Sequence, residues 1–283
     1  MNKSLKHLAI LSGCLLTPLI ICRAYFSYMS KKSGPFSYDR LYSWRFGKIH
    51  YRVNGRGQPL LLVHGIYPGA DMHEWHEADS RIYQSFKVYE IDLLGFGHSE
   101  KPSISYSAYL YIRLINNFIS DIIKEPALVA ASDYSAAYTV LGYIFDPTLY
   151  KKIILISPAG ITEGQTLPSF RHLICKWMLN TPLIGDLSYI GLTRRGTAKA
   201  IFEKLHNRHT IASFAPSVIP MSAFVGGINS MLPISALLCK YLNVNIIDKL
   251  NRIKIPMLIL SRESFGFRVM PASLKSFLEI NAI

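Results

Sequence analysis

One stretch of this sequence, residues 127–138, carries the side chain best placed to do covalent chemistry. It reads A-L-V-A-A-S-D-Y-S-A-A-Y, an apolar run typical of a strand, then a polar turn, then the start of a helix. A strand that turns abruptly into a helix, with small residues two positions either side of the apex, is the geometry of a nucleophile elbow. The apex side chain of such a turn is presented for attack on a substrate, and here it would be the carboxylate of Asp133.

Three residues of this stretch compete for the apex. Ser132 would place the bulky Tyr134 two positions later, and Ser135 would start the turn inside the helix. Asp133 has Ala131 and Ser135 on either side, and both are small enough for a strained turn against which a helix packs. The sequence therefore predicts Asp133 at the apex.

Composition and charge limit the class of protein. The chain has 283 residues and is 50% hydrophobic, which is enough for the core of one large α/β domain. Only 17% of the residues are charged and the mean hydropathy is +0.21, which favours membrane association. The net charge of +13 is scattered, which suits an anionic lipid surface, and no nucleic-acid-binding signature accompanies it. We expect a small hydrophobic substrate or ligand and a membrane as partners, and no nucleic acid. The sequence leaves the oligomeric state undecided.

The cysteines give no sign of a metal site or a disulfide framework. They show no C-x-x-C spacing, and two of them lie in the apolar N-terminal segment. We expect buried apolar cysteines, no metal and no cofactor. The four are Cys14, Cys22, Cys175 and Cys239.

The N-terminal segment, residues 1–32, is predicted to be a single-pass membrane anchor. Lys3 and Lys6 precede an apolar run over residues 8–22, and aromatic residues follow it to residue 28. A cleaved signal peptide is disfavoured because the run ends without a small-x-small site, and a lipoprotein box at residues 11–14 is a weak match. Lysine and arginine flank both ends of the run, so the side of the membrane stays open.

The elements that must position Asp133 alternate between strands and helices. Residues 42–53 alternate as one or two strands around Gly47, and residues 106–123 have helical periodicity. Continuous apolar runs predict strands buried on both faces at residues 59–63, 87–94, 128–131, 152–157 and 255–260. The pattern predicts a doubly wound, mostly parallel sheet with its site at the carboxyl ends of the strands.

Several of these segments together resemble the α/β-hydrolase family. The matching pieces are L-L-L-V-H-G from residue 60, I-D-L-L-G-F-G-H-S from residue 91, the elbow, and I-L-I-S-P-A-G from residue 154. The resemblance covers roughly Trp44 to Asn281. It implies a first core part at residues 33–159, an inserted helical lid at 160–250 and a truncated second core part at 251–283, with the last strand missing. The predicted lid is basic, with Arg171, Lys176, Arg194, Arg195, Lys199, Lys204 and Arg208.

The resemblance also implies roles for individual residues. The backbone N–H groups of Ile66 and Tyr134 would form the oxyanion hole, and His64 with Gly65 would brace the loop rather than act as the base. His98 would have a similar bracing role. Haloalkane dehalogenases and epoxide hydrolases of this fold use Asp as the nucleophile, although dehalogenases usually have Asn and Trp where this chain has Ile66 and Tyr134. The alternative is that Asp133 replaces a lost nucleophile and is kept because Asp tolerates a positive φ.

The other two members of the family's triad have no clear counterpart. Ser264, beside Glu263, falls where the acid is expected, and no His follows His209. Two functions therefore stay open. One is a membrane-anchored hydrolase of an unknown hydrophobic substrate; the other is a catalytically inactive or truncated relative that binds a ligand or partner.

Overall fold

The computed structural model describes residues 17, 24, 40–75, 82–161, 167–182, 184–193, 229–263 and 266–270. The predicted anchor at residues 1–32 lies outside this set apart from two isolated residues, and Ser264 and the segment beyond Met270 lie outside it as well. Among the residues described, no helix combines the length and the apolar character needed to cross a membrane.

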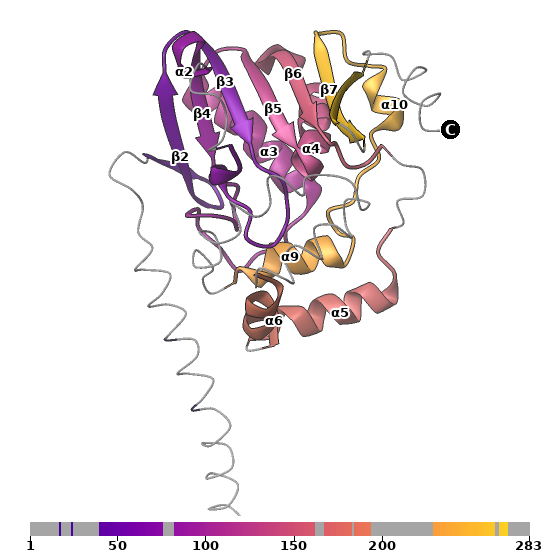
Figure 1. The fold of residues 1–283 in the computed structure, drawn as a ribbon. Coiled ribbons are helices and arrows are strands. Elements are labelled where there is room, and N and C mark those ends of the chain that lie inside the picture. Colours follow the sequence, from indigo (N-terminus) through magenta and orange to yellow (C-terminus); the bar gives the residue numbers. More distant parts are fainter. Residues whose placement is uncertain are drawn as a thin grey trace, which may run out of the picture.

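An eight-stranded sheet forms the centre of the fold, in the order β1-β2-β4-β3-β5-β6-β7-β8 (Figure 1). Strands β4, β3, β5, β6 and β7 run parallel to one another. The pairs β1–β2, β2–β4 and β7–β8 are antiparallel. This confirms the predicted α/β fold with a mostly parallel sheet. The strands are β1 Arg40–Trp44, β2 Gly47–Gly55, β3 Gln58–Val63, β4 Phe86–Ile91, β5 Ala127–Ser132, β6 Tyr150–Ile156, β7 Met257–Glu263 and β8 Gly266–Met270.

The far edge of the sheet differs from the prediction. The sequence predicts no strand after residues 255–260, but β7 turns back directly into β8, and the register pairs Glu263 with Gly266. So short a connection permits only an antiparallel partner. Strand β8 is thus the return of a hairpin and not a parallel strand reached through a further helix.

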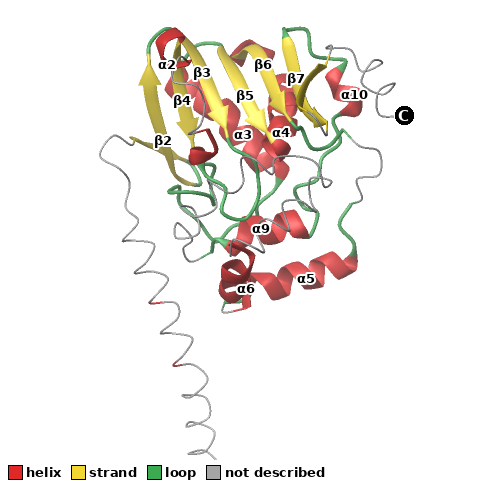
Figure 2. Ribbon diagram, viewed as in Figure 1, coloured by secondary structure: helices red, strands yellow, loops and turns green. Residues whose placement is uncertain are grey.

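Helices α3 and α4 pack against one face of the sheet (Figure 2). Helix α3, Ala108–Phe118, begins at Ser107, whose side chain accepts a hydrogen bond from the Leu110 amide, and it continues into a π-helical turn, η2, over Ile119–Ile123. The predicted helix at 106–123 is therefore confirmed. The remaining elements of the core are η1 Met72–Trp75, α2 Ile82–Ser85, α4 Asp133–Phe145 and η3 Pro147–Leu149.

Both faces of the central strands are buried, which explains their continuous apolar runs. On β3, Leu61 and Val63 join the large core under α3 and α4, whereas Leu60 and Leu62 join a smaller cluster on the opposite face. Trp75 and residues of α2 pack against that smaller cluster. Each strand therefore occupies a fixed register, which sets the positions of the loops that follow it.

A helical layer lies beyond the carboxyl ends of β3 and β5 (Figure 1). It comprises α5 Phe170–Asn180, α6 Ile184–Thr193 and α9 Met231–Leu238, followed by the short α10 Ile247–Leu250, which packs on α4. Where the chain returns from this layer, it is bound to the core by the Tyr138 hydroxyl, which donates a hydrogen bond to the Leu242 carbonyl at 2.8 Å. Residues 160–250 are helical where described, and the exact limits of the lid stay a prediction.

The cysteine prediction was wrong for one residue. Cys239 is buried as expected, but Cys175 is exposed.

Candidate active site

Asp133 lies at the turn between β5 and α4, in a left-handed conformation with φ +52°. Such a backbone is unfavourable for most L-residues and is tolerated best by Asp, Asn and Gly. The surrounding contacts hold it there, since the Ala159 amide donates to the Asp133 carbonyl at 3.1 Å. The side chain of Asp133 is 4% exposed, so it is a buried carboxylate at the end of a central strand.

The loop after β3 approaches this carboxylate closely. The Ile66 amide donates to Asp133 Oδ2, with nitrogen and oxygen 3.2 Å apart. Gly65 permits the approach, because an added Cβ would lie 3.1 Å from Ser132 Oγ and 3.2 Å from Asp133 Cβ. Tyr134 follows as the second residue of α4, where backbone N–H groups have no acceptor within the helix. The structure thus brings the loop amide at Ile66 and the start of α4 together around Asp133.

His64 lies at the start of this loop with both ring nitrogens engaged. Nδ1 is 2.6 Å from the Gly65 carbonyl, and Nε2 is 3.0 Å from the Leu93 amide nitrogen. A carbonyl only accepts and an amide only donates, so these partners assign the proton to Nδ1 and leave Nε2 as an acceptor. The Ser135 hydroxyl donates to the His64 carbonyl at 2.6 Å, which joins the loop to α4 as well.

Sequence reasoning missed a second carboxylate, Glu74, next to the elbow. Its Oε2 accepts from the Gly65 amide at 2.8 Å and from the Tyr67 hydroxyl at 3.1 Å, and its Oε1 accepts from the Ser132 hydroxyl. Burial raises the pKa of Glu74 above its ordinary value, although the hydrogen bonds from Ser132 and Gly65 oppose that shift. Glu74 therefore ties the loop to the last residue of β5, directly before Asp133.

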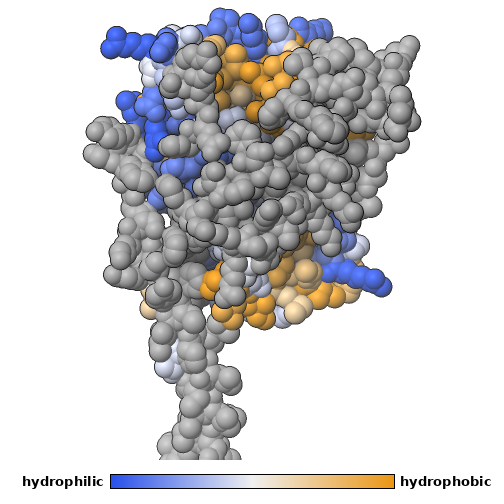
Figure 3. All heavy atoms as spheres, in the orientation of Figure 1, coloured by the Kyte–Doolittle hydropathy of each residue, from blue (hydrophilic) through white to orange (hydrophobic). Residues whose placement is uncertain are grey.

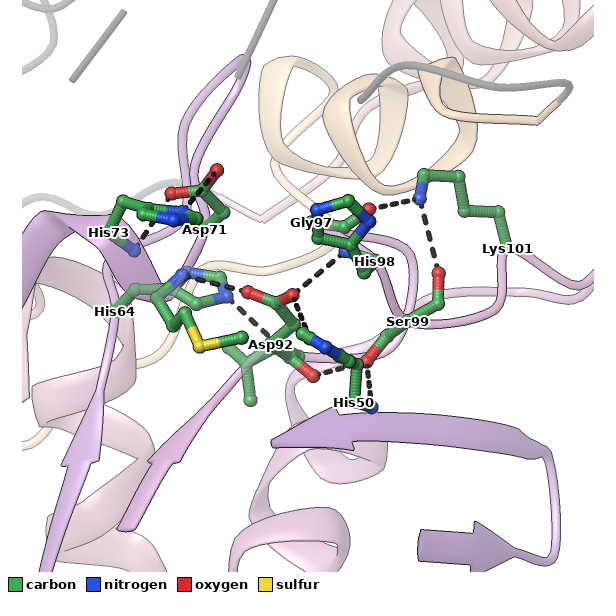
Figure 4. A network of polar contacts seen from close by, with 11 residues as sticks. His50, His64, Asp71, His73, Asp92, Gly97, His98, Ser99 and Lys101 are labelled. Carbon is green, nitrogen blue, oxygen red and sulfur yellow. Dashed lines mark hydrogen bonds and ion pairs between the residues drawn. The ribbon is translucent and has the colours of Figure 1, made fainter. Parts of the chain in front are cut away.

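Behind the loop, a buried network is centred on Asp92 (Figure 4). Asp92 Oδ1 accepts from the Met72 amide at 2.8 Å, and Oδ2 accepts from the His98 amide at 2.8 Å and pairs with His50 Nδ1 at 2.9 Å. Its burial alone would raise the pKa, but the hydrogen bond from His50 and the neighbouring His64 lower the pKa of Asp92 to about 2. The network fixes the loops that follow β3 and β4.

The rim of this network contains further titratable groups. Lys101 Nζ donates to the Gly97 carbonyl at 2.6 Å and to the Ser99 carbonyl at 3.1 Å, and burial lowers its pKa to about 8 (Figure 4). His73 Nδ1 lies 3.3 Å from Asp71 Oδ2, and a hydrogen bond from His73 to that carboxylate raises the pKa of His73. In the part of the chain that the structure covers, no three His, Cys, Asp or Glu side chains are arranged to hold a metal ion.

The sequence model of the alpha/beta hydrolase family matches residues 60–242, which include the loop after β3, the elbow and most of the helical layer. The chain belongs to the alpha/beta hydrolase family. The strand-to-helix turn at Asp133 occupies the place of the nucleophile elbow in this fold. Ser264, where the resemblance places the family's acid, lies outside the residues described.

Similar proteins are hydrolases or have no assigned activity. An uncharacterized protein of Mycobacterium tuberculosis is 32% identical over 118 residues, which are 41% of this chain and 34% of that protein. The 2-hydroxy-6-oxo-6-(2'-aminophenyl)hexa-2,4-dienoic acid hydrolase of Metapseudomonas resinovorans is 27% identical over 135 residues, 47% of each chain. A solved serine hydrolase involved in carbazole degradation matches with a TM-score of 0.59 at 16% identity, over 79% of this chain and 78% of that one. The matched regions thus span less than half of each of these two curated relatives, and the structural likeness shows the fold alone.

Proposed function

We propose that this protein is a hydrolase of a small hydrophobic substrate and that the Asp133 carboxylate is its nucleophile. The observation that carries the proposal is the turn itself: Asp133 has φ +52° and its Oδ2 accepts the Ile66 amide at 3.2 Å. A nucleophilic carboxylate needs one oxygen directed at the substrate and the other held by the oxyanion hole. This arrangement fits an alkyl halide or an epoxide better than a carboxylic ester, because a carboxylate attacking an ester would form a mixed anhydride.

The chemical steps follow from the two oxygens of Asp133. With an alkyl halide, Oδ1 forms a bond to the carbon, the carbon–halogen bond breaks, and halide leaves with the electron pair. Oδ2 then becomes the carbonyl oxygen of the new ester, already beside the Ile66 amide. Attack of water on the ester carbonyl would place negative charge on Oδ2, where the amides of Ile66 and Tyr134 would stabilise it before the alcohol leaves and the carboxylate is restored.

The second step needs a base to take a proton from water. His64 is poorly placed to act as this base, because its two ring nitrogens are engaged with the Gly65 carbonyl and the Leu93 amide. General-base assistance contributes about 10² to 10⁴ in rate, so without it the ester on Asp133 should accumulate. The same observation supports a second candidate, a relative that binds a hydrophobic ligand and does not turn it over.

We further propose that the protein is attached to a membrane through its N-terminal segment, residues 1–32. The support is the apolar run at residues 8–22 with basic residues at both ends. Alkaline carbonate washing of membranes tests it, and the full-length protein should stay in the pellet. Release into the supernatant would refute integral attachment.

Intact-protein mass spectrometry after incubation with short haloalkanes and epoxides tests the nucleophile. We expect a mass increase of one alkyl group per chain that survives denaturation, together with background rates on p-nitrophenyl acetate. A chain that binds these compounds, as measured by a thermal shift, but gains no mass and releases no halide would favour the binding-only candidate. Rapid hydrolysis of p-nitrophenyl acetate would overturn the assignment of a carboxylate nucleophile.

A further inference from the structure

Helix α5 carries its apolar stripe on the outside of the molecule. The stripe consists of Phe170, Leu173, Ile174, Trp177 and Met178, whose spacing places them on one face of a helix. In a globular domain such a stripe normally faces the core, but all five side chains are exposed, and Phe170 and Trp177 are 74% and 72% exposed.

Two polar side chains of α5 contact the neighbouring segments of the helical layer, and these contacts fix the orientation of the helix. Lys176 Nζ lies 3.8 Å from the centre of the Tyr241 ring, and the Ser235 hydroxyl of α9 donates to Asn180 Oδ1. Leu179, on the same inward side, packs against the main core. Rotating α5 to bury its apolar stripe would break these contacts.

Neighbouring residues extend the stripe into a patch. Leu167 before α5 is 83% exposed, and Ile184 and Leu187 of α6 are 44% and 51% exposed. Figure 3 shows hydrophobic surface gathered at this end of the molecule, over α5 and α6. Contiguous exposed apolar surface of this kind marks an interaction site rather than ordinary surface variation.

The charge around the patch indicates its partner. Residues 167–182 contain no Asp or Glu, Arg171 is exposed and His172 is partly exposed, and the whole chain has a net charge of +13. We propose that this patch, the five stripe residues with Leu167, Ile184 and Leu187, docks on an anionic lipid surface. Trp and Phe suit the boundary between headgroups and acyl chains, and the basic side chains would lie beside the headgroups.

This docking differs from attachment through the N-terminal segment and does not depend on the chemistry of Asp133. A second copy of the chain is a poorer occupant, because two patches with the same positive surroundings would repel each other. Docked in this way, the helical layer would lie between the membrane and the carboxyl ends of β3 and β5 (Figure 1).

Trp177 provides a direct readout in the full chain. The tryptophans are Trp44, Trp75 and Trp177, so the N-terminal segment contains none and cannot itself give a signal. With vesicles of phosphatidylglycerol and phosphatidylcholine, we expect a blue shift of the emission and quenching by brominated acyl chains. Trp177→Phe should remove the quenched component while keeping an aromatic side chain in the stripe.

Two further variants separate the patch from general surface apolarity. Ile174→Glu places a charge in the middle of the stripe and should abolish the quenching of Trp177. Phe145→Ser is the matched control, because Phe145 is 63% exposed at the end of α4, outside the patch, and this variant should be quenched like the parent. Circular dichroism and thermal melting check that both variants fold.

The dependence on lipid charge completes the test. Quenching should weaken with phosphatidylcholine alone and at about 1 M salt, where the screening length falls to about 3 Å. The proposal is overturned if Trp177 stays unquenched on anionic vesicles, or if neutral vesicles quench it equally. A blue shift that grows with protein concentration in the absence of vesicles would overturn it in favour of a second copy.

Discussion

Two buried aspartates stand at the carboxyl ends of the strands on either side of β3, and they are held in different ways. Asp92, after β4, has an ordinary backbone and receives hydrogen bonds on both carboxylate oxygens, from Met72, His98 and His50. Asp133, after β5, has φ +52° and receives the Ile66 amide on Oδ2. The two share burial and charge but not geometry.

Under the proposed function, one sheet edge would support both structure and chemistry. Donors on both oxygens stabilise the ionised form of Asp92 and make it a fixed point for the loops around it. Under the proposed function, the strained turn beside the Ile66 amide would instead prepare Asp133 to attack a substrate. Burial and residue type alone would not distinguish these two carboxylates.

The largest expected effect comes from removing the nucleophile while keeping its shape. Asp133→Asn should reduce the alkylation rate at least about 100-fold, because an amide is a poor nucleophile. Since Asn tolerates a positive φ as well as Asp does, the melting temperature should change little. Intact mass and thermal melting on the same samples measure both. If Asp133→Asn is alkylated at the parent rate, Asp133 is not the nucleophile and does not differ from Asp92 in this respect.

Asp92→Asn should give the opposite pattern, with lost stability as the main effect. The side-chain NH₂ group of the new Asn would face the backbone N–H of Met72 or His98, and two donors facing each other would be left buried and unpaired. We therefore expect a loss of about 3 kcal/mol in the free energy of unfolding. Urea denaturation measures it. Gly191→Ala on α6 is the control for producing and denaturing a variant protein, because an added Cβ there meets nothing within 4 Å. Undiminished stability of Asp92→Asn would show that the network is not structural.

Glu74 should affect the reaction through the loop and not through the substrate. Glu74→Gln turns one acceptor into a donor facing Gly65 or Ser132, and we expect alkylation of Asp133 to slow about tenfold. Because burial raises the pKa of Glu74, this carboxyl takes up its proton at a higher pH in the folded protein than an ordinary Glu does. The parent rate should therefore fall as the pH is lowered toward this pKa, whereas the rate of the variant should not follow this titration. If the parent and Glu74→Gln show parallel pH profiles, the titration of Glu74 does not affect the reaction.

A further prediction concerns the acid dependence that Asp92 contributes to stability. Its pKa is about 2 in the folded chain against 3.8 ordinarily, so the unfolded chain binds the proton more readily. This contribution is fully present above about pH 4 and is lost as the pH falls toward 2, and it amounts to about 2 kcal/mol. Denaturation series at several pH values should show a steeper acid loss for the parent than for Asp92→Asn. Equal slopes would contradict the lowered pKa.

The fold was largely readable from the sequence because its strands are buried on both faces. The apolar runs at residues 59–63, 128–131 and 152–157 fall on β3, β5 and β6 to within two residues. The hairpin return into β8 was not predicted, since a short strand at a sheet edge has no comparable pattern. The amphipathic spacing of α5 was visible too, but periodicity does not say which side of a helix faces the core.

The site was predictable only where side-chain size or order along the chain carries a signal. The small residues around Asp133 identified the turn, and the L-L-L-V-H-G segment located the loop amide. Glu74 and Asp92 escaped because their partners include backbone amides from distant parts of the chain, such as Gly65 for one and His98 for the other. A backbone donor leaves no residue type in the sequence to recognise.

The most direct test of the central claim is to locate the alkyl group after a single incubation with a short haloalkane. Tandem mass spectrometry of the digested protein should place one alkyl ester on Asp133, and none on Asp92 or Glu74, with about one group per chain. An adduct on another residue, or steady halide release that survives Asp133→Asn without any adduct, would contradict the assignment of Asp133 as the nucleophile.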